Sequence, residues 1–203
     1  MSFDRRTAFR ADDPDLNFYK LMTAVVVPRP IAWVTTLSSA GVVNLAPHSF
    51  YTVACARPPI VQFTSVGKKD TLRNVRATGE FVVNLAHGPL IEAVNNSSAA
   101  FDPSASEPAE LGITMEPSEV VRPPRVRDSP ASIECTLHST HELGDSTIVL
   151  GTVVAFSVAD DVLVDGHPEY DRLDPLARLG KDEWAVHAQV VSIRRPRTPD
   201  DIA

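Results

Sequence analysis

Polar side chains that could hold a phosphorylated ligand gather in two short segments of the chain. The first contains Thr35, Thr36 and the run NLAPHS at residues 44–49. The second is the run SVGKKDT at residues 65–71, which offers hydroxyl groups, two ammonium groups and, where a helix follows, free backbone N–H groups. All of these groups favour a phosphate. If the segments converge, they predict a site for a phosphorylated, planar ligand, because flat ligands favour an apolar wall with a few convergent polar groups.

Each segment also has a purely structural interpretation. Residues 65–71 could form a solvent-facing turn between a strand and a helix, and the two threonines could be an ordinary cross-strand pair. His48 could be a surface histidine or one whose hydrogen bonds are satisfied in the core. Asp70 would repel a phosphate if its carboxylate faced it, but as a helix N-cap it would turn toward the helix amides.

The elements around these segments are expected to be mainly strands. Residues 31–37 and 42–46 predict a hairpin around the turn sequence SSAG, with Pro47 ending the regular pairing. Further strands are expected at residues 60–65, 81–85, 133–138, 146–158 and about 184–193. In the strand at 146–158, one side carries Ile148, Leu150, Val154, Phe156 and Val158.

Helices are expected to be short. Residues 70–78 predict one, with Asp70 as N-cap and Gly79 just past its end, and residues 89–96 predict a second. Residues 97–112 and 122–130 are polar and rich in proline, so we expect irregular excursions rather than domain linkers. Strands with short helices between them favour a closed barrel, because closure removes exposed strand edges.

Composition predicts one globular domain over the whole chain of 203 residues, with 43% hydrophobic and 22% charged residues. The formal net charge of −7 argues against binding nucleic acid or an anionic membrane surface. No leader pattern is visible at the N-terminus and no apolar run approaches a membrane span, so we expect a cytoplasmic protein. The two cysteines, Cys55 and Cys135, are expected to be small core residues rather than a disulfide or metal site.

Several familiar catalytic motifs are missing from the sequence. It has no Gly-x-Gly-x-x-Gly, no complete Walker A motif, no Gly-x-Ser-x-Gly and no His-Glu-x-x-His. A Rossmann domain, a hydrolase and a zinc protease are therefore not indicated. His138 and His141 lie three residues apart at an expected strand end and turn, with no evident third ligand, so no metal is expected there.

The chain resembles the flavin reductase-like, FMN-binding split-barrel family over about residues 17–193. The matching pieces are residues 29–36 (RPIAWVTT), 44–50 (NLAPHSF), 58–59, Ser65, 69–74 (KDTLRN), 78–84 (TGEFVVN), 133–135, 150–154 and 172–180, followed by Trp184-Ala185. The resemblance implies a mainly β fold, a Greek-key-like split β-barrel with a few short helices, in which residues 1–203 form one domain with polar tails at both ends. It also implies a homodimer with one FMN per subunit near the interface.

The resemblance also implies roles for particular residues. Thr35, Thr36 and the backbone of Leu45, Ala46 and Pro47 would line the isoalloxazine ring and ribityl chain. Ser49, Ser65, Lys69 and Thr71 would hold the phosphate end, and the region of Leu179, Gly180 and Trp184 would lie near the flavin, from this subunit or its partner. Arg29 and Asn44 complete the expected FMN-binding set. His48 and Trp184 are candidates for the wall facing the ring, and Arg29 or His48 could supply positive charge there.

The implied activity is that of an NAD(P)H-dependent flavin reductase, in which hydride passes from a nicotinamide to FMN and no protein nucleophile is needed. A partner monooxygenase or another electron acceptor would use the reduced flavin. Two alternatives remain: a flavoprotein that keeps FMN bound and passes electrons between proteins, and a binding module of the same fold with another ligand or none. His48 stands where family members often carry an aromatic residue and Trp184 where tyrosine is common, and both departures concern the substrate side.

Overall fold

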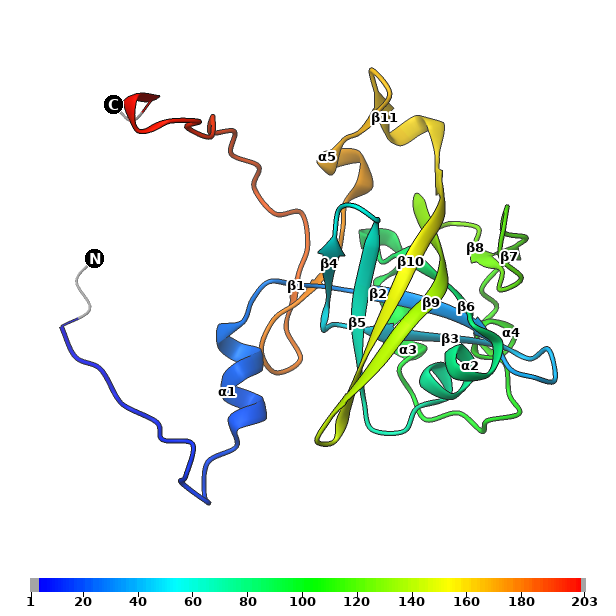
Figure 1. Cartoon of the computed structure of the whole chain (residues 1–203), viewed down its shortest axis with the longest axis horizontal. Coiled ribbons are helices and arrows are strands. Elements are labelled where there is room, and N and C mark those ends of the chain that lie inside the picture. The colour runs from blue at the N-terminus through cyan, green and yellow to red at the C-terminus, as the bar shows by residue number, and fades with distance from the viewer. Residues whose placement is uncertain (1–3, 202–203) are drawn as a thin grey trace.

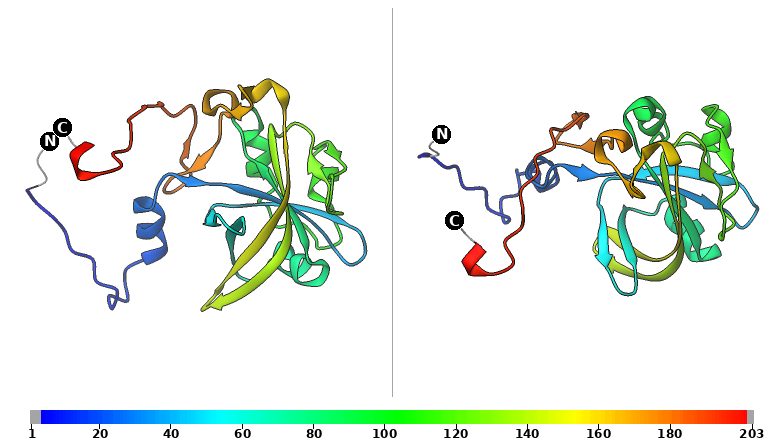
Figure 2. Two further views of the ribbon diagram at one scale, coloured as in Figure 1. Left: turned by 45° about the horizontal axis from the view of Figure 1, so that its top comes forward. Right: turned by 90° about the horizontal axis from the view of Figure 1, so that it is seen from above.

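The computed structural model describes residues 4–201 and shows a mainly β protein with a few short helices (Figure 1). Its main feature is an antiparallel seven-stranded sheet in the order β3-β2-β6-β9-β10-β5-β4. In that order the strands span Val43–His48, Ala32–Leu37, Glu80–Leu85, Ala131–Leu143, Ser146–Val158, Ile60–Val66 and Tyr51–Cys55. The sheet curls, so that its two ends approach each other and the rings of His48 on β3 and Phe63 on β5 lie 4.7 Å apart (Figure 2).

Smaller elements surround this sheet in the described part of the chain. A three-stranded sheet has the order β1-β13-β14, with bounds Arg29–Pro30, Ala177–Arg178 and Trp184–Ala185. Two short pairs are β7 (Met115–Glu116) with β8 (Arg125–Val126) and β11 (Leu163–Val164) with β12 (His167–Pro168). The helices are α1 (Phe18–Val25), α2 (Asp70–Thr78), α3 (Ile91–Asn96), α4 (Glu107–Glu110) and α5 (Tyr170–Leu173), with 3₁₀ turns at Gly88–Leu90, Asp160–Val162 and Pro199–Asp201.

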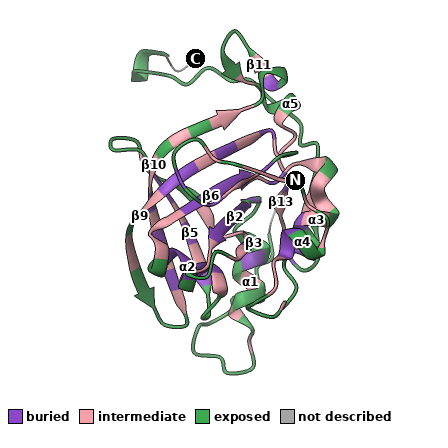
Figure 3. Cartoon of the chain, turned by 90° about the vertical axis from the view of Figure 1, so that its right-hand side faces the viewer, coloured by how far each residue is buried: buried purple, intermediate pink, exposed green. Residues whose placement is uncertain are grey.

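Buried residues lie on both faces of strand β2 (Figure 3). Ala32 and Val34 belong to one apolar cluster, which includes Phe63, Phe81 and Val149. On the opposite face, Trp33 joins a second cluster, whose members also include Ile31, Leu45, Val94, Val126 and Leu176. Because β2 serves both clusters, its side chains hold the curled sheet and the outer helices together.

The hairpin of β9 and β10 confirms the expected alternation and shows which side is buried. The inward side of β10 carries Thr147, Val149 and Gly151. A Cβ at Gly151 would lie 2.2 Å from the Phe81 ring, so only glycine fits there. The expected apolar side faces outward, and Phe156 is 61% exposed.

Asn84 is a buried amide with all of its hydrogen-bonding groups used. Its Nδ2 donates to the Trp33 carbonyl at 3.0 Å and to the Thr35 hydroxyl at 2.8 Å. Its Oδ1 accepts from the Val126 N–H at 2.8 Å and the Ser132 hydroxyl at 3.0 Å. One side chain therefore ties β2, β6, β8 and β9 together, and such a network stabilises a fold because every member is satisfied.

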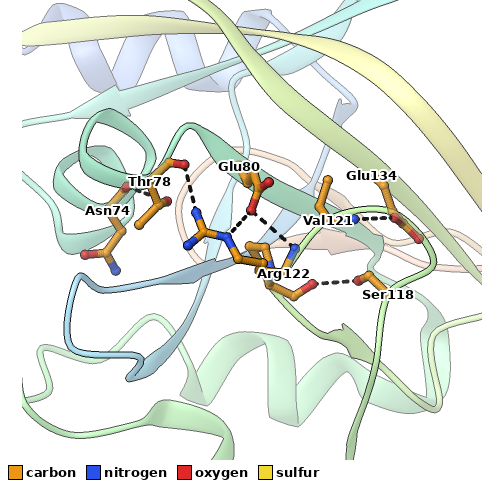
Figure 4. Close-up of polar contacts among 8 residues, drawn as sticks. Asn74, Thr78, Glu80, Ser118, Val121, Arg122 and Glu134 are labelled. Atoms are coloured by element: carbon orange, nitrogen blue, oxygen red, sulfur yellow. Dashed lines mark hydrogen bonds and ion pairs between the residues drawn. The ribbon is translucent and has the colours of Figure 1, made fainter.

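The segment that follows β7 is held by two acidic side chains of the sheet (Figure 4). Glu134 is fully buried and its carboxylate accepts the N–H groups of Glu119, Val120 and Val121 at 2.7–3.1 Å. Glu80 accepts the Arg122 guanidinium at 2.7 Å, and Arg122 also reaches the Thr78 carbonyl. These carboxylates are structural, since their oxygens are used to order a loop.

Several expected boundaries need correction. Pro47 does not end the pairing, because it lies opposite Trp33 and β3 continues to His48. The strand expected over residues 184–193 is only β14, and the chain beyond it extends away from the sheet, as the N-terminal segment does (Figure 1). Strand β4 was not predicted. The two helices were confirmed, except that Lys69 rather than Asp70 occupies the N-cap position.

Candidate functional site

The two polar segments of the sequence meet at one cavity of about 420 Å³. Its walls come from the end of β3 and the turn after it, the connection from β5 to α2, and residues 97–107. Ser49 and Lys69 both line it, so the expected convergence of the two segments is confirmed. Of the expected FMN-binding residues, the lining contains Asn44, Ala46, Pro47, Ser49, Lys69 and Thr71.

Helix α2 brings positive groups to this cavity. Two buried amide–hydroxyl bonds hold the helix: Asn44 donates to Thr71 at 3.2 Å and Asn74 to Thr36 at 3.1 Å. Lys69 precedes the helix, and neither it nor Lys68 forms an ion pair with another residue between 4 and 201. The start of the helix and two ammonium groups without an ion-pair partner among residues 4–201 therefore lie in the cavity wall.

Asp70 does not act as the expected N-cap. No side chain caps the start of α2, and the Asp70 carboxylate instead pairs with Arg73 at 2.7 Å, one turn along the helix. The ion pair draws this carboxylate toward Arg73, which offsets its charge. Asp70 thus weakens the attraction for an anion less than an unpaired carboxylate in the same wall would.

Glu107 is a second acidic group in the cavity wall, and it is 7% exposed. One carboxylate oxygen accepts the Leu45 N–H at 3.0 Å and so fixes strand β3 from the side of α4. Burial raises the pKa of this carboxyl group; the hydrogen bond from Leu45 acts in the opposite direction and the charge of Asp70 in the same direction. The buried surroundings of Glu107 therefore disfavour its ionised form.

His48 lies in the same wall and is 8% exposed. Burial lowers its pKa to about 4; a hydrogen bond with the Thr64 backbone opposes this and the charge of Lys69 adds to it. The imidazole is neutral at pH 7, so the expectation that His48 supplies positive charge is wrong. Its Nε2 has no hydrogen-bond partner among residues 4–201.

Other expected ligands lie behind the cavity rather than in its lining. Thr35, Thr36 and Leu45 are fully buried, and both hydroxyls are hydrogen-bonded to asparagines. Ser65 is also fully buried and donates to the Gly67 carbonyl at 3.3 Å. These residues position the lining from behind.

Arg29 and Gly180 contact the C-terminal end of helix α1. The buried Arg29 guanidinium donates to the carbonyls of Thr23, Val26 and Leu179, the last at 2.7 Å. A Cβ at Gly180 would lie 3.2 Å from Ala24. Neither residue lines this cavity. Together they hold α1 against the segment that leads to Trp184.

Sequence reasoning missed the loop that closes the other side of the cavity. Residues 97–107 contribute Ser97, Ser98, Phe101 and Glu107, and Tyr19 and Phe50 add aromatic surface. The composition of this loop, rich in serine and alanine, predicted only an irregular segment. The small side chains of this loop, which let a backbone come close to a cavity, are the one signal in the sequence that could have indicated its position.

A second cavity of about 860 Å³ adjoins the first, and Pro47, Ser49 and Ser98 line both. Trp184 lies in its wall, with the Arg178 guanidinium 4.6 Å from the indole centroid. Trp184 is therefore separated from Lys69 and belongs to a neighbouring compartment. The guanidinium covers one face of the indole, and Glu92 and Asp182 lie in the same cavity wall, so this compartment combines an aromatic ring with charges of both signs.

Two other absences apply to residues 4–201. No group of three or more metal-ligating side chains is found, and His138 and His141 lie exposed within β9 rather than at its end. None of the helices there reaches the length and hydrophobicity of a membrane span.

Comparisons with known proteins agree with the family resemblance drawn from the sequence. A family model described as flavin reductase like domain matches residues 22–174. The structure of nitrilotriacetate monooxygenase component B from Bacillus cereus is 30% identical, with a TM-score of 0.84 and coverage of 93% of this chain and 100% of that one. A putative flavin reductase with split barrel domain from Shewanella frigidimarina shares the fold at 22% identity, with a TM-score of 0.81 and coverage of 87% and 91%. The reductase subunit HsaB of a flavin-dependent monooxygenase from Mycobacterium tuberculosis is 33% identical over 63% of this chain and 64% of its own length.

Replacing Glu107 with glutamine should stabilise the protein at neutral pH. Because burial raises the pKa of this carboxyl group, the folded state holds its proton longer than the unfolded state does, and stability is lost as pH rises above the usual value of 4.5. We expect the melting temperature of Glu107→Gln to exceed that of the wild type at pH 7.5 and the gap to shrink toward pH 4.5. Glu110→Gln, on the exposed side of α4, should show no such trend; a gap that widens at low pH would contradict the argument.

Proposed function

The chain belongs to the flavin reductase like domain family, and we propose that it binds FMN and transfers hydride from NAD(P)H to it. One observation carries the proposal: the two polar segments line a single cavity, together with two lysines at a helix start that form no ion pair among residues 4–201. A volume of about 420 Å³ lies within the range of small-molecule sites.

The residues present fit a phosphorylated flavin. Lys68, Lys69 and the first N–H groups of α2 suit a phosphate. The Ser49 hydroxyl, for which no hydrogen-bond partner is found between residues 4 and 201, is available to a ligand. Phe50 and Phe101 form an apolar part of the cavity wall. The buried Nε2 of His48 has no hydrogen-bond partner among residues 4–201 and could accept a hydrogen bond from a ligand. When bound, FMN would supply the two-electron chemistry that the protein's own side chains cannot.

The chain's own residues would bind the flavin, orient it and shield it from water. Lys69 would fix the anionic end, and the β3 margin from Ala46 to Ser49 would set the position of the rest. The loop at residues 97–107 would exclude water from the cavity, which strengthens every electrostatic contact inside it. Because His48 is neutral, stabilisation of developing negative charge falls to backbone N–H groups and to Arg178 of the neighbouring cavity.

The second cavity is the proposed place for the nicotinamide donor. It shares Pro47, Ser49 and Ser98 with the first, so a ligand there would contact a ligand in the first cavity. Trp184 offers a face for a planar ring and Arg178 a cation for a phosphate. In this arrangement Trp184 would face the reacting rings from the second cavity, and His48 would line the first.

A monooxygenase is the proposed consumer of the reduced flavin. Two similar proteins carry names of this kind, a monooxygenase component B and the reductase subunit of a flavin-dependent monooxygenase. The alternatives are a flavoprotein that retains FMN and passes electrons to another protein, and a binding module without turnover. They differ from the main proposal in measurable ways.

We also propose that the protein is a homodimer and that its sheet closes into a split barrel within one domain. Packing of His48 on β3 against Phe63 on β5 supports closure. For the dimer, the support is apolar surface that a second copy would cover. Helix α1 exposes Tyr19, Met22 and Val25, and the chain beyond β14 exposes Val190, Val191 and Ile193.

The FMN site is tested by the affinity for a ligand series. Fluorescence titration of the purified protein should give saturable binding of FMN and weaker binding of riboflavin, which lacks the phosphate. Lys69→Ala should weaken FMN by about 30-fold and leave riboflavin nearly unchanged, because it removes a charged hydrogen bond to the phosphate. Lys181→Ala, an exposed lysine outside the lining of this cavity, is the control. Absence of FMN binding by the wild type would overturn the proposed function.

Turnover separates the three functions. With excess free FMN, a reductase should oxidise NADH or NADPH continuously, as followed by absorbance at the nicotinamide band. A flavoprotein that retains its FMN should show one fast reduction and then depend on an added protein acceptor. A binding module should show neither, and that result would refute the proposed hydride transfer.

The dimer is tested by mass in solution. Sedimentation should give twice the chain mass of 22.0 kDa for the wild type. Met22→Asp combined with Val25→Asp should shift it toward the single chain, because burying two carboxylates in an apolar interface is costly. Lys20→Asp places a carboxylate on the same helix outside that surface and should leave the mass unchanged. A wild-type protein with the mass of one chain would contradict the proposal.

A further inference from the structure

We propose that His48 determines which ligands the first cavity accepts, by receiving a hydrogen bond from a hydroxyl group of the ligand's polyol chain. The inference rests on the proposed function and adds to it a selection for flavins that carry a ribityl chain. It assigns a ligand contact to a residue for which the sequence analysis offered a place in the ring-facing wall or a positive charge.

The first step is geometric. His48 is the last residue of β3, and its Nε2 is buried without any partner among residues 4–201. Such an orphan is unusual, because buried polar atoms in folded proteins almost always have a partner. The ring is held against Phe63 at 4.7 Å and lines the cavity, so a ligand there is a candidate partner for this nitrogen.

The second step concerns the kind of partner. The Thr64 backbone is the other hydrogen-bonding contact of the ring. That contact raises the pKa, as a carbonyl that accepts from a ring N–H does, and Nε2 has no partner among residues 4–201; we therefore assign the ring proton to Nδ1 and the lone pair to Nε2. With a pKa of about 4 the ring stays neutral at pH 7, so Nε2 accepts a hydrogen bond and cannot donate one.

The third step identifies the donor. A phosphate dianion has no proton to offer, so Nε2 does not contact the phosphate. Lys69 is close enough to His48 to affect its titration, which places the ring near the phosphate end of the cavity rather than in the second compartment with Trp184. The part of FMN next to the phosphate is the ribityl chain, and its hydroxyl groups are donors.

The experiment compares three flavins on three proteins. Lumiflavin lacks the hydroxyls and the phosphate, riboflavin has the hydroxyls only, and FMN has both. His48→Phe keeps an aromatic ring against Phe63 but removes the acceptor, and should weaken FMN and riboflavin equally, by about 10-fold, while leaving lumiflavin unchanged. His48→Gln restores an acceptor at similar reach and should recover most of the loss. All affinities are measured at pH 7.5 by quenching of flavin fluorescence.

Each outcome decides the matter. Equal loss for all three flavins, or no loss for any, would overturn the inference, since the first indicates a structural role or a contact with the ring. Failure of His48→Gln to recover affinity would also count against it. Melting temperatures of the ligand-free variants show whether the fold is intact. If wild-type protein binds no flavin the proposed function fails, whereas normal FMN binding with no effect at position 48 refutes this inference alone.

Discussion

The candidate site depends on two buried hydrogen bonds between helix α2 and the sheet. Asn44 donates to Thr71 and Asn74 donates to Thr36, so the amides on β3 and α2 match hydroxyls on α2 and β2. Leu72 and Val75 pack on the same side and add apolar contact. Because an unpaired amide or hydroxyl is costly in a dry interior, the pairs fix the rotation of the helix as well as its position. That rotation presents Lys69 to the cavity.

The same bonds explain what sequence could and could not predict. The strand and helix that flank residues 65–71 follow from hydrophobic alternation and from Gly79, and the convergence of the two polar segments was correctly expected. Which hydroxyls face the ligand was not predictable, because Thr36 and Thr71 have identical chemistry and only the fold decides their roles. The extension of β3 past Pro47 was missed since proline usually ends a ladder, yet here it pairs with Trp33.

The charged groups around the cavity differ in whether another residue holds them. Two lysines that form no ion pair among residues 4–201 share its wall with two carboxylates, but Asp70 pairs with Arg73 and Glu107 accepts the Leu45 N–H. Each carboxylate is therefore held by another partner, whereas the ammonium groups are not. The whole chain carries a net charge of −7, yet these partners reduce the repulsion that the two carboxylates would exert on an anion in the cavity.

Strand alternation along β3 then decides which side chains lie on each side of the sheet. Ala46 and His48 lie opposite Val34 and Ala32 and share their side of the sheet, where Phe63 packs. Leu45 and Pro47 point to the side of Trp33, and from this side the second cavity is lined. A shift of one residue would exchange the two sets and move the imidazole to the side of Trp33. The pairing of Pro47 with Trp33, which the sequence analysis did not expect, therefore also keeps His48 on the side of Phe63.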